Sequence, residues 1–151
     1  DTRPGGGGGA RTPDPGRPGR TVEAGPGRPR HGGERGRNDP RVREALLITC
    51  QAAAGPYAIA SIPLLAEGGA RDAYPWLQRI LVVDVPEAVQ LARLLQRDGI
   101  DEDLARMMIA SQASRRERLA IADDVLVNDG PLQALPAQVE ALDRLYRRLA
   151  A

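Results

Sequence analysis

Two arginines four positions apart, Arg93 and Arg97, have the residue type and the spacing to bind phosphate groups. Residues at this spacing share one face of a helix. The planar guanidinium binds phosphoryl oxygens through two parallel hydrogen bonds and keeps its charge when buried. Further arginines follow at positions 106, 115, 116 and 118. Taken singly, each arginine also fits a structural role, since Arg97 would suit a helix C-terminus and Arg93 could pair with Glu87 or Asp98.

Polar residues also follow the predicted strands, where a parallel sheet would gather them at one edge. The segments are 63–67, with Leu64, Leu65 and Glu67, then 84–86, with Asp84, and the turn 128–130. Ligands bind outside the carboxyl ends of strands in open parallel sheets. The alternatives are structural: Asp84 could cap a helix, Glu67 could be solvated, the leucines could belong to the core, and Asn128-Asp129-Gly130 is a turn signal.

The elements that would position these residues alternate between helix and strand. Apolar periodicity, proline positions and capping residues predict a helix at 40–53, strands at 57–62 and 79–85, a loop at 63–76, helices at 86–97, 101–112 and 114–122, a strand at 124–127 and a final helix from 135. Continuous apolar strands joined by helical crossovers indicate an α/β fold with a parallel sheet and helices on both faces. The two helices at 101–122 are more than a single crossover between strands requires. An insertion of this kind at the carboxyl edge of a sheet predicts a lid.

The first 38 residues have a different composition. They hold 12 of the 17 glycines, 6 of the 13 prolines and 8 arginines against 4 acidic residues. With one residue among Val, Ile, Leu and Met, this segment cannot bury enough apolar surface to fold, so we predict that 1–38 is disordered and that 39–151 forms the domain. An arginine-rich tail that binds RNA is an alternative. The tail has no aromatic residue to stack on bases, so we expect no nucleic-acid partner.

Residue types that are rare or absent exclude several kinds of site. All 21 basic residues are arginine, so the chain has no lysine, and the single cysteine, Cys50, excludes an internal disulfide and a cysteine-built metal site. No apolar run reaches the length of about 18 residues that a membrane span needs. No signal peptide opens the sequence. We therefore expect a cytoplasmic protein with no membrane partner and no metal-ligating residues of its own.

The order of several motifs resembles one enzyme family. The segments IPLLAE (62–67), VVDVPEAVQLARLLQRDGID (82–101), MIASQ (108–112) and ADDVLVNDG (122–130) are similar to the C-terminal two-thirds of dephospho-coenzyme A kinase. The family's motif positions fall on Gln90, Arg93, Arg97, Asp98, Gln112, Asp123, Asn128 and Gly130. The resemblance covers about residues 39–151, and several motifs in the right order make it specific.

The resemblance implies a three-layer P-loop kinase fold with a helical lid at about 93–122. It implies transfer of the ATP γ-phosphoryl group to the ribose 3′-hydroxyl of dephospho-CoA, with Mg²⁺, as a step of coenzyme A synthesis. By position, Arg93 and Arg97 would contact ATP phosphates, and Asn128 and Gly130 would lie against the adenine. The loop with Leu64, Leu65 and Glu67 would form the acceptor side.

The chain departs from the family pattern at its beginning. The family's G-x-x-x-x-G-K-[ST] phosphate loop requires a lysine, which this chain lacks, and the family's acidic base is absent too. Gly5–Gly9 precedes no Gly-Lys pair, and Asp39 replaces the histidine of a usual His-Pro motif. We interpret the chain as a kinase without its N-terminal phosphate-loop unit, with residues 1–38 a frameshifted or mispredicted start, no assignable catalytic residue and little activity by itself. The alternative is a non-catalytic fragment that binds nucleotide or CoA.

Overall fold

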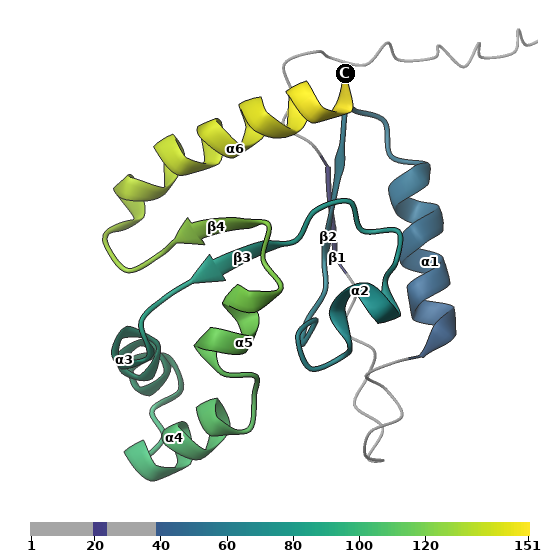
Figure 1. Ribbon diagram of the computed structural model, residues 1–151. Coiled ribbons are helices and arrows are strands. Elements are labelled where there is room, and N and C mark those ends of the chain that lie inside the picture. Colours follow the sequence, from purple (N-terminus) through teal and green to yellow (C-terminus); the bar gives the residue numbers. More distant parts are fainter. Residues whose placement is uncertain (1–19, 24–38) are drawn as a thin grey trace, which may run out of the picture.

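The structure, a computed structural model, describes residues 20–23 and 39–151. Within these ranges the chain is an α/β protein whose strands all pair in parallel (Figure 1). The predicted class is therefore confirmed. The prediction of disorder for 1–38 falls mostly on residues outside the described ranges. A short strand, β1 (Arg20–Glu23), is described there although the sequence predicted no strand before residue 57.

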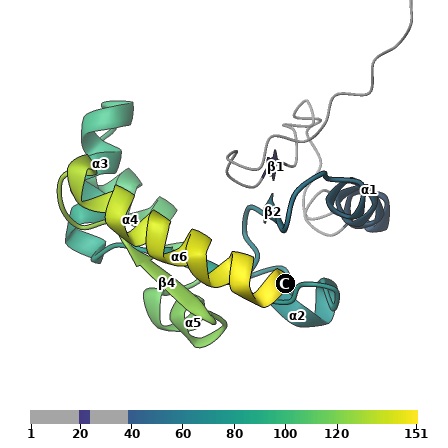
Figure 2. The same ribbon diagram turned by 90° about the horizontal axis from the view of Figure 1, so that it is seen from above.

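The four described strands form two pairs. β1 pairs with β2 (Ala58–Ser61), and β3 (Leu81–Asp84) pairs with β4 (Asp124–Val127). The sequence predicted one parallel sheet, and the described strands are divided between two two-stranded sheets. Figure 2 shows β1 and β2 next to α1 (Pro40–Gln51), whereas β4 lies beneath the last helix.

The helices begin and end close to the residues that the sequence indicated. Pro40 occupies the first turn of α1, and the Asp39 carboxylate caps it by accepting from the Arg41 amide at 2.9 Å. The loop after β2 contains one short helix, α2 (Ala70–Ala73). Arg43 on α1 donates to the carbonyl of Ala73 at 3.3 Å, which holds α2 against α1.

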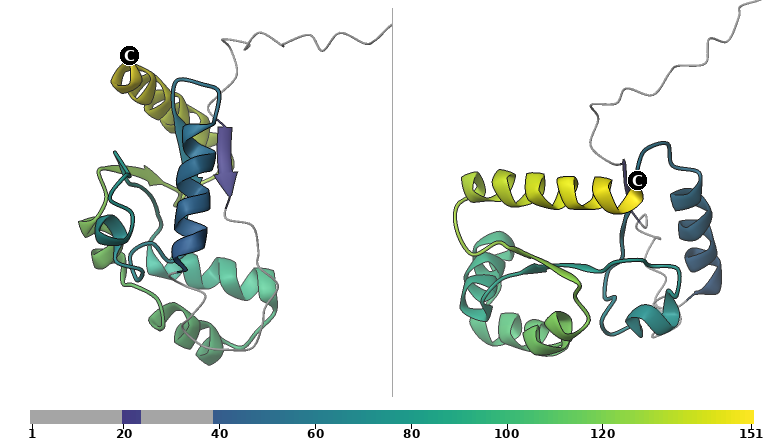
Figure 3. Two further views of the ribbon diagram at one scale, coloured as in Figure 1. Left: turned by 90° about the vertical axis from the view of Figure 1, so that its right-hand side faces the viewer. Right: turned by 45° about the horizontal axis from the view of Figure 1, so that its top comes forward.

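A run of helices separates β3 from β4, in the region where the sequence predicted a lid. It consists of α3 (Glu87–Asp98), α4 (Glu102–Ala110) and α5 (Arg115–Ala120). Asp101 caps α4 by accepting from the Leu104 amide at 2.9 Å, and Gly99 ends α3 in the left-handed conformation that glycine adopts without strain. These helices gather on the same side of the molecule, shown in teal to green in the right-hand view of Figure 3.

The chain ends in the long helix α6 (Leu135–Ala150), which follows a single 3₁₀ turn, η1 (Leu132–Ala134). Pro136 lies in the first turn of α6, where its missing N–H costs nothing, as predicted. α6 packs on β4, and the Gln138 side chain bonds both the amide and the carbonyl of Val127 at 2.9 Å. Leu126 of β4 is buried beneath it.

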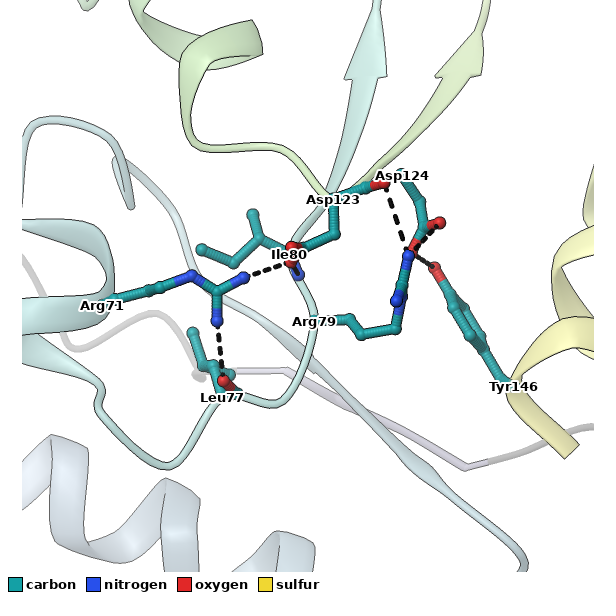
Figure 4. A network of polar contacts seen from close by, with 7 residues as sticks. All are labelled: Arg71, Leu77, Arg79, Ile80, Asp123, Asp124 and Tyr146. Atoms are coloured by element: carbon teal, nitrogen blue, oxygen red, sulfur yellow. Dashed lines mark hydrogen bonds and ion pairs between the residues drawn. The ribbon is translucent and has the colours of Figure 1, made fainter. Parts of the chain in front are cut away.

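A polar network fixes the amino ends of β3 and β4 (Figure 4). The guanidinium of Arg79 donates to both carboxylate oxygens of Asp124 at 2.7 and 2.8 Å, and Tyr146 of α6 donates to the same carboxylate at 3.0 Å. Asp123 accepts from the Ile80 amide at 2.6 Å and pairs with Arg71. The network holds the sheet, α6 and the loop after β2 in one arrangement, at the end of the strands opposite the candidate site.

Candidate functional site

The site begins where β3 and β4 end. Asp84 is the last residue of β3, and the Asn128 amide extends the parallel ladder by donating to the Asp84 carbonyl at 2.8 Å. The chain then leaves β3 through Pro86 into α3, and leaves β4 through the turn at 128–130. Both segments therefore emerge at the same edge of the sheet, which is where open parallel sheets bind ligands.

Arg93 joins α3 to the turn after β4. Its guanidinium donates to the backbone carbonyl of Asn128 at 2.7 Å and to that of Gly130 at 3.5 Å. The contact brings together three residues that the sequence singled out. Arg93 lies 35 positions before Asn128 and 37 positions before Gly130 in the chain. The pairing of Arg93 with Glu87 or Asp98, considered from the sequence, is not the contact that the structure describes.

Arg97 lies one helical turn beyond Arg93 on the same face of α3. Its guanidinium donates to both carboxylate oxygens of Asp98 at 2.6 and 2.9 Å, and this neighbour raises the pKa of Arg97. The Arg97 side chain remains 74% exposed. An exposed ion pair of this kind is weak, so an anionic ligand can compete for the guanidinium.

Both arginines border a pocket between α3 and α4. The pocket has a volume of about 580 Å³ and is lined by apolar side chains, side-chain amides and the two guanidinium groups: Val85, Gln90, Arg93, Leu94, Gln96, Arg97, Met108, Ile109 and Gln112. Small-molecule sites typically combine an apolar wall with a few polar groups that fix orientation. The lining therefore has the composition of a site for a ligand with one apolar and one anionic part.

An ion pair that the sequence did not predict connects the end of β3 to α5. Arg115, the first residue of α5, donates to both carboxylate oxygens of Asp84 at 2.8 and 2.7 Å. Asp84 is only 7% exposed, and the hydrogen bonds from Arg115 lower the pKa of its carboxyl group. The sequence placed Asp84 at the strand end and Arg115 in the lid, but the two are 31 positions apart and no spacing rule links them.

The predicted acceptor loop lies against the linker between α4 and α5 rather than in this pocket. Glu67 accepts a hydrogen bond from the Ala113 amide, in the linker between α4 and α5, at 2.5 Å. Leu64 has a left-handed backbone (φ 56°), and its carbonyl accepts from Gly68 at 2.9 Å, so Leu64 and Leu65 form a tight turn. Glu67 therefore ties the loop after β2 to the α4–α5 linker.

The described residues contain no group of three or more His, Cys, Asp or Glu side chains that could hold a metal ion. Asp84, the carboxylate at the end of β3, has both oxygens engaged by Arg115. Mg²⁺ is commonly bound through substrate phosphates and one or two carboxylates, and Arg115 already pairs with the charge of the Asp84 carboxylate.

Comparison with known proteins decides the family. A family model described as dephospho-CoA kinase matches residues 37–134. The chain belongs to the dephospho-CoA kinase family. A dephospho-CoA kinase of Xanthomonas campestris pv. campestris (strain 8004) is 59% identical over 108 residues, which are 72% of this chain and 52% of the relative. A dephospho-CoA kinase of Xylella fastidiosa (strain 9a5c) is 57% identical over 112 residues, which are 74% of this chain and 54% of the relative.

A solved structure supports the fold assignment. The crystal structure of TT1252 from Thermus thermophilus superposes with a TM-score of 0.57 at 27% identity, covering 68% of this chain and 52% of that one. The predicted membership of the dephospho-CoA kinase family, with its α/β kinase fold, is thus confirmed. The chain spans about half the length of the curated relatives that it matches. Within the described ranges, no helix has the length and apolar character of a membrane span.

Proposed function

We propose that this chain supplies the nucleotide-binding rim and the lid of a dephospho-CoA kinase. The activity is transfer of the ATP γ-phosphoryl group to the ribose 3′-hydroxyl of dephospho-CoA. The observation that carries this proposal is the contact of the Arg93 guanidinium with the carbonyls of Asn128 and Gly130. It joins a helix that carries arginines to a turn at the carboxyl edge of the sheet, where a nucleotide would lie.

The proposed roles of the rim residues follow from their contacts. Arg93 holds the turn at 128–130, so that Asn128 and Gly130 present their backbone to an adenine ring. Arg97, whose side chain is mostly exposed, exchanges its partner Asp98 for an ATP phosphate. The exchange is favourable because a phosphate offers more charge than a single carboxylate and accepts the same two parallel hydrogen bonds.

The proposed domain has residues 39–151 as the kinase part, with the lid at about 93–122 and the segment 1–38 outside it. The Asp84–Arg115 pair sets the position of α5 over the strand ends. Glu67, Leu64 and Leu65 form the acceptor side, and the bond from the Ala113 amide to Glu67 couples this loop to the lid. Dephospho-CoA would then lie between the loop after β2 and the α3–α5 insertion, and ATP would lie against α3 and the turn after β4.

The chain by itself is proposed to bind nucleotide without turning it over. Phosphoryl transfer depends on neutralising the charge of the transferred group, which P-loop kinases achieve with a loop lysine and Mg²⁺. The sequence has no lysine that could supply this charge. Arg93 and Arg97 provide positive charge at the rim only. This also favours the second candidate function, a nucleotide-binding fragment without catalysis.

A coupled assay and a binding titration on the same purified chain test the proposal. With ATP, Mg²⁺ and dephospho-CoA we expect no phosphorylated product above background, together with saturable binding of ATP. Turnover of about 1–100 s⁻¹, the range of ordinary kinases, would contradict the proposal that the chain is inactive alone. Absence of any ATP binding would contradict the assignment of the rim.

A further inference from the structure

A cavity lies between the two pairs of parallel strands, and we call it the inter-sheet slot. It has a volume of about 420 Å³, and its wall includes Ala58, Ile59 and Ala60 of β2 and Leu81 of β3. The helices α1 and α6 add mostly apolar side chains to the wall: Leu47, Cys50, Tyr146, Leu149 and Ala150. In Figure 2, β2 lies on the side of β1 that is nearer to β4. The slot therefore lies between the edge of β2 that faces away from β1 and the edge of β3 that faces away from β4.

The backbone of β3 points hydrogen-bonding groups into this slot. The carbonyls of Ile80 and Asp84 accept hydrogen bonds from amides at or next to the two ends of β4. Successive residues of a strand direct their N–H and C=O groups to opposite edges. The backbone groups of Leu81 and Val83 therefore point away from β4, and no described strand pairs with that edge.

The opposite edge of the same pair is closed by a side chain. Gln138 of α6 accepts from the Val127 amide and donates to the Val127 carbonyl, both at 2.9 Å. Covering a sheet edge in this way prevents a further strand from pairing there. Val83, on the slot side, is 56% exposed. Of the two edges of the β3–β4 pair, the one at the slot is thus the edge open to another strand.

The strands β2 and β3 run in the same direction on the two sides of the slot. The loop after β2 brings Glu67 to the Ala113 amide, and the end of β3 brings Asp84 to Arg115, two positions further along the chain. The carboxyl ends of both strands are therefore turned toward the same segment. One strand between them could pair in parallel with both, and would join the four described strands into one sheet of five.

The composition of the chain says where such a strand could come from. A parallel strand covered by helices is a continuous apolar run. Apart from Val22, which belongs to β1, residues 1–38 contain no Val, Ile, Leu, Met or aromatic residue and cannot supply one. The curated relatives from Xanthomonas campestris and Xylella fastidiosa are matched over only 52% and 54% of their length. The family therefore has a further stretch of similar length that could supply the strand.

We propose that the inter-sheet slot binds one apolar β-strand, parallel to β2 and β3, from the half of the dephospho-CoA kinase length that this chain does not span. Its backbone pairs with Leu81 and Val83 on one edge and with β2 on the other, and its side chains pack on α1 and α6. Its carboxyl end emerges beside Asp84, next to the proposed nucleotide rim. The inference goes beyond the proposed function, because binding of the strand does not require ATP.

Co-expression of two polypeptides tests the inference. The probe is the part of the Xanthomonas campestris (strain 8004) dephospho-CoA kinase that lies outside the residues matched here, produced together with the full chain. We expect a complex of one copy of each. Hydrogen exchange of the Leu81 and Val83 amides should slow about tenfold or more in the complex, because they become paired. The Val125 amide, which faces the outer edge of β4, should exchange as before.

A pair of proline variants identifies the edge that binds. Val83→Pro removes an N–H that faces the slot and leaves the β3–β4 hydrogen bonds in place. It should weaken the complex about tenfold or more, because proline cannot donate to a ladder and its ring obstructs the neighbouring strand. Val125→Pro, the same change at an exposed valine on the opposite edge, is the matched control and should not weaken it. Ala60→Leu, which fills the slot from β2 without changing β3, should also weaken the complex. Sedimentation of the diluted complexes measures each dissociation constant.

Several results would overturn the inference. They are the absence of a complex, a complex in which the Leu81 and Val83 amides exchange as fast as before, and equal weakening by Val83→Pro and Val125→Pro. Slow exchange of these two amides in the monomeric chain alone would show that the chain already closes the slot itself. The same slowing in a dimer of the chain would assign the slot to a second copy. ATP binding is measured separately, so failure of the nucleotide rim and failure of the strand slot are distinguishable.

Discussion

Arg93 has the most specific set of contacts among the predicted site residues. Its planar fork reaches two carbonyls of one turn, which a lysine ammonium on a flexible stem cannot do in the same way. The sequence suggested a phosphate contact for Arg93, whereas the structure engages it with backbone oxygens. In the proposed site this arginine acts by positioning Asn128 and Gly130.

We therefore expect Arg93→Lys to weaken ATP binding about tenfold or more. Hydrogen bonds from a charged donor contribute roughly 1.5–3 kcal/mol, and the substitution loses their fixed geometry. Isothermal titration with ATP measures the change. Arg144→Lys on α6 is the control, since its only described ion pair is a long contact of 3.8 Å with Glu140. If Arg93→Lys bound ATP as tightly as the parent chain, the turn at 128–130 would not be part of the nucleotide site.

Asp124 links stability to pH. The hydrogen bonds from Arg79, and then that from Tyr146, lower the pKa of the Asp124 carboxyl group. An aspartate in an unfolded chain titrates near 4. Because the folded pKa lies below that value, the pair stabilises the chain above about pH 4, and this stabilisation is lost as the pH falls through the folded pKa.

Asp124→Asn should therefore lower the stability at pH 7 and flatten its dependence on pH between about 6 and 3. The amide cannot hold Arg79 as an ion pair, and it does not titrate. Urea unfolding followed by circular dichroism across this range measures both effects. A variant whose stability falls with acid as steeply as the parent's would show that other carboxylates dominate the transition.

At the scale of elements, α5 begins with a complete capping box. The Ser114 hydroxyl accepts from the Glu117 amide at 3.2 Å, and the Glu117 carboxylate accepts from the Ser114 amide at 2.7 Å. A helix of six residues depends strongly on such a cap. The cap also sets the position of Arg115, the next residue, toward Asp84.

Ser114→Ala should destabilise α5 by about 1 kcal/mol, the usual loss for an N-cap. Hydrogen exchange of the α5 amides should speed up by about fivefold while the exchange of α6 amides stays unchanged. Ser114→Thr keeps the hydroxyl and should restore protection. Equal acceleration in both helices would indicate global rather than local unfolding.

The elements were largely predictable because their signals are local. Asp39-Pro40, Asp101 and Gly99 mark helix ends, and the apolar run before Asp84 marks β3. The contacts that build the site were not predictable, since Arg93–Asn128 and Asp84–Arg115 join residues more than 30 positions apart. The sequence placed Asp84 and Asn128 at one sheet edge and the two arginines on the helices between them, but side-chain pairing depends on the angle at which each helix leaves its strand.

At the scale of the molecule, the described strands leave apolar surface open. Val83 is 56% exposed in the middle of β3, and Val125 and Val127 of β4 are also exposed. A second cavity of about 420 Å³ lies between β2 and the start of β3, with Ile59 and Leu81 in its wall. Short parallel pairs with open apolar surface are prone to association.

The purified chain should therefore aggregate with rising concentration, and Val83→Lys should reduce this because a charge on exposed strand surface discourages further pairing. Light scattering at increasing concentration measures the effect. Leu132→Lys, at a still more exposed position of η1, is the control for added charge alone. If both variants scattered light equally less than the parent, the change in net charge, and not the exposed sheet surface, would explain the reduced aggregation.

In the proposed function, the rim formed by α3 and the turn after β4 binds an adenine nucleotide. The most direct measurement is the change in backbone amide NMR signals when ATP is added to the ¹⁵N-labelled chain. We expect the largest shifts to fall on residues 93–97 and on Asn128 and Gly130, and we expect them to saturate. Shifts spread over α1 and α6 instead, or no shift at high ATP concentration, would contradict it.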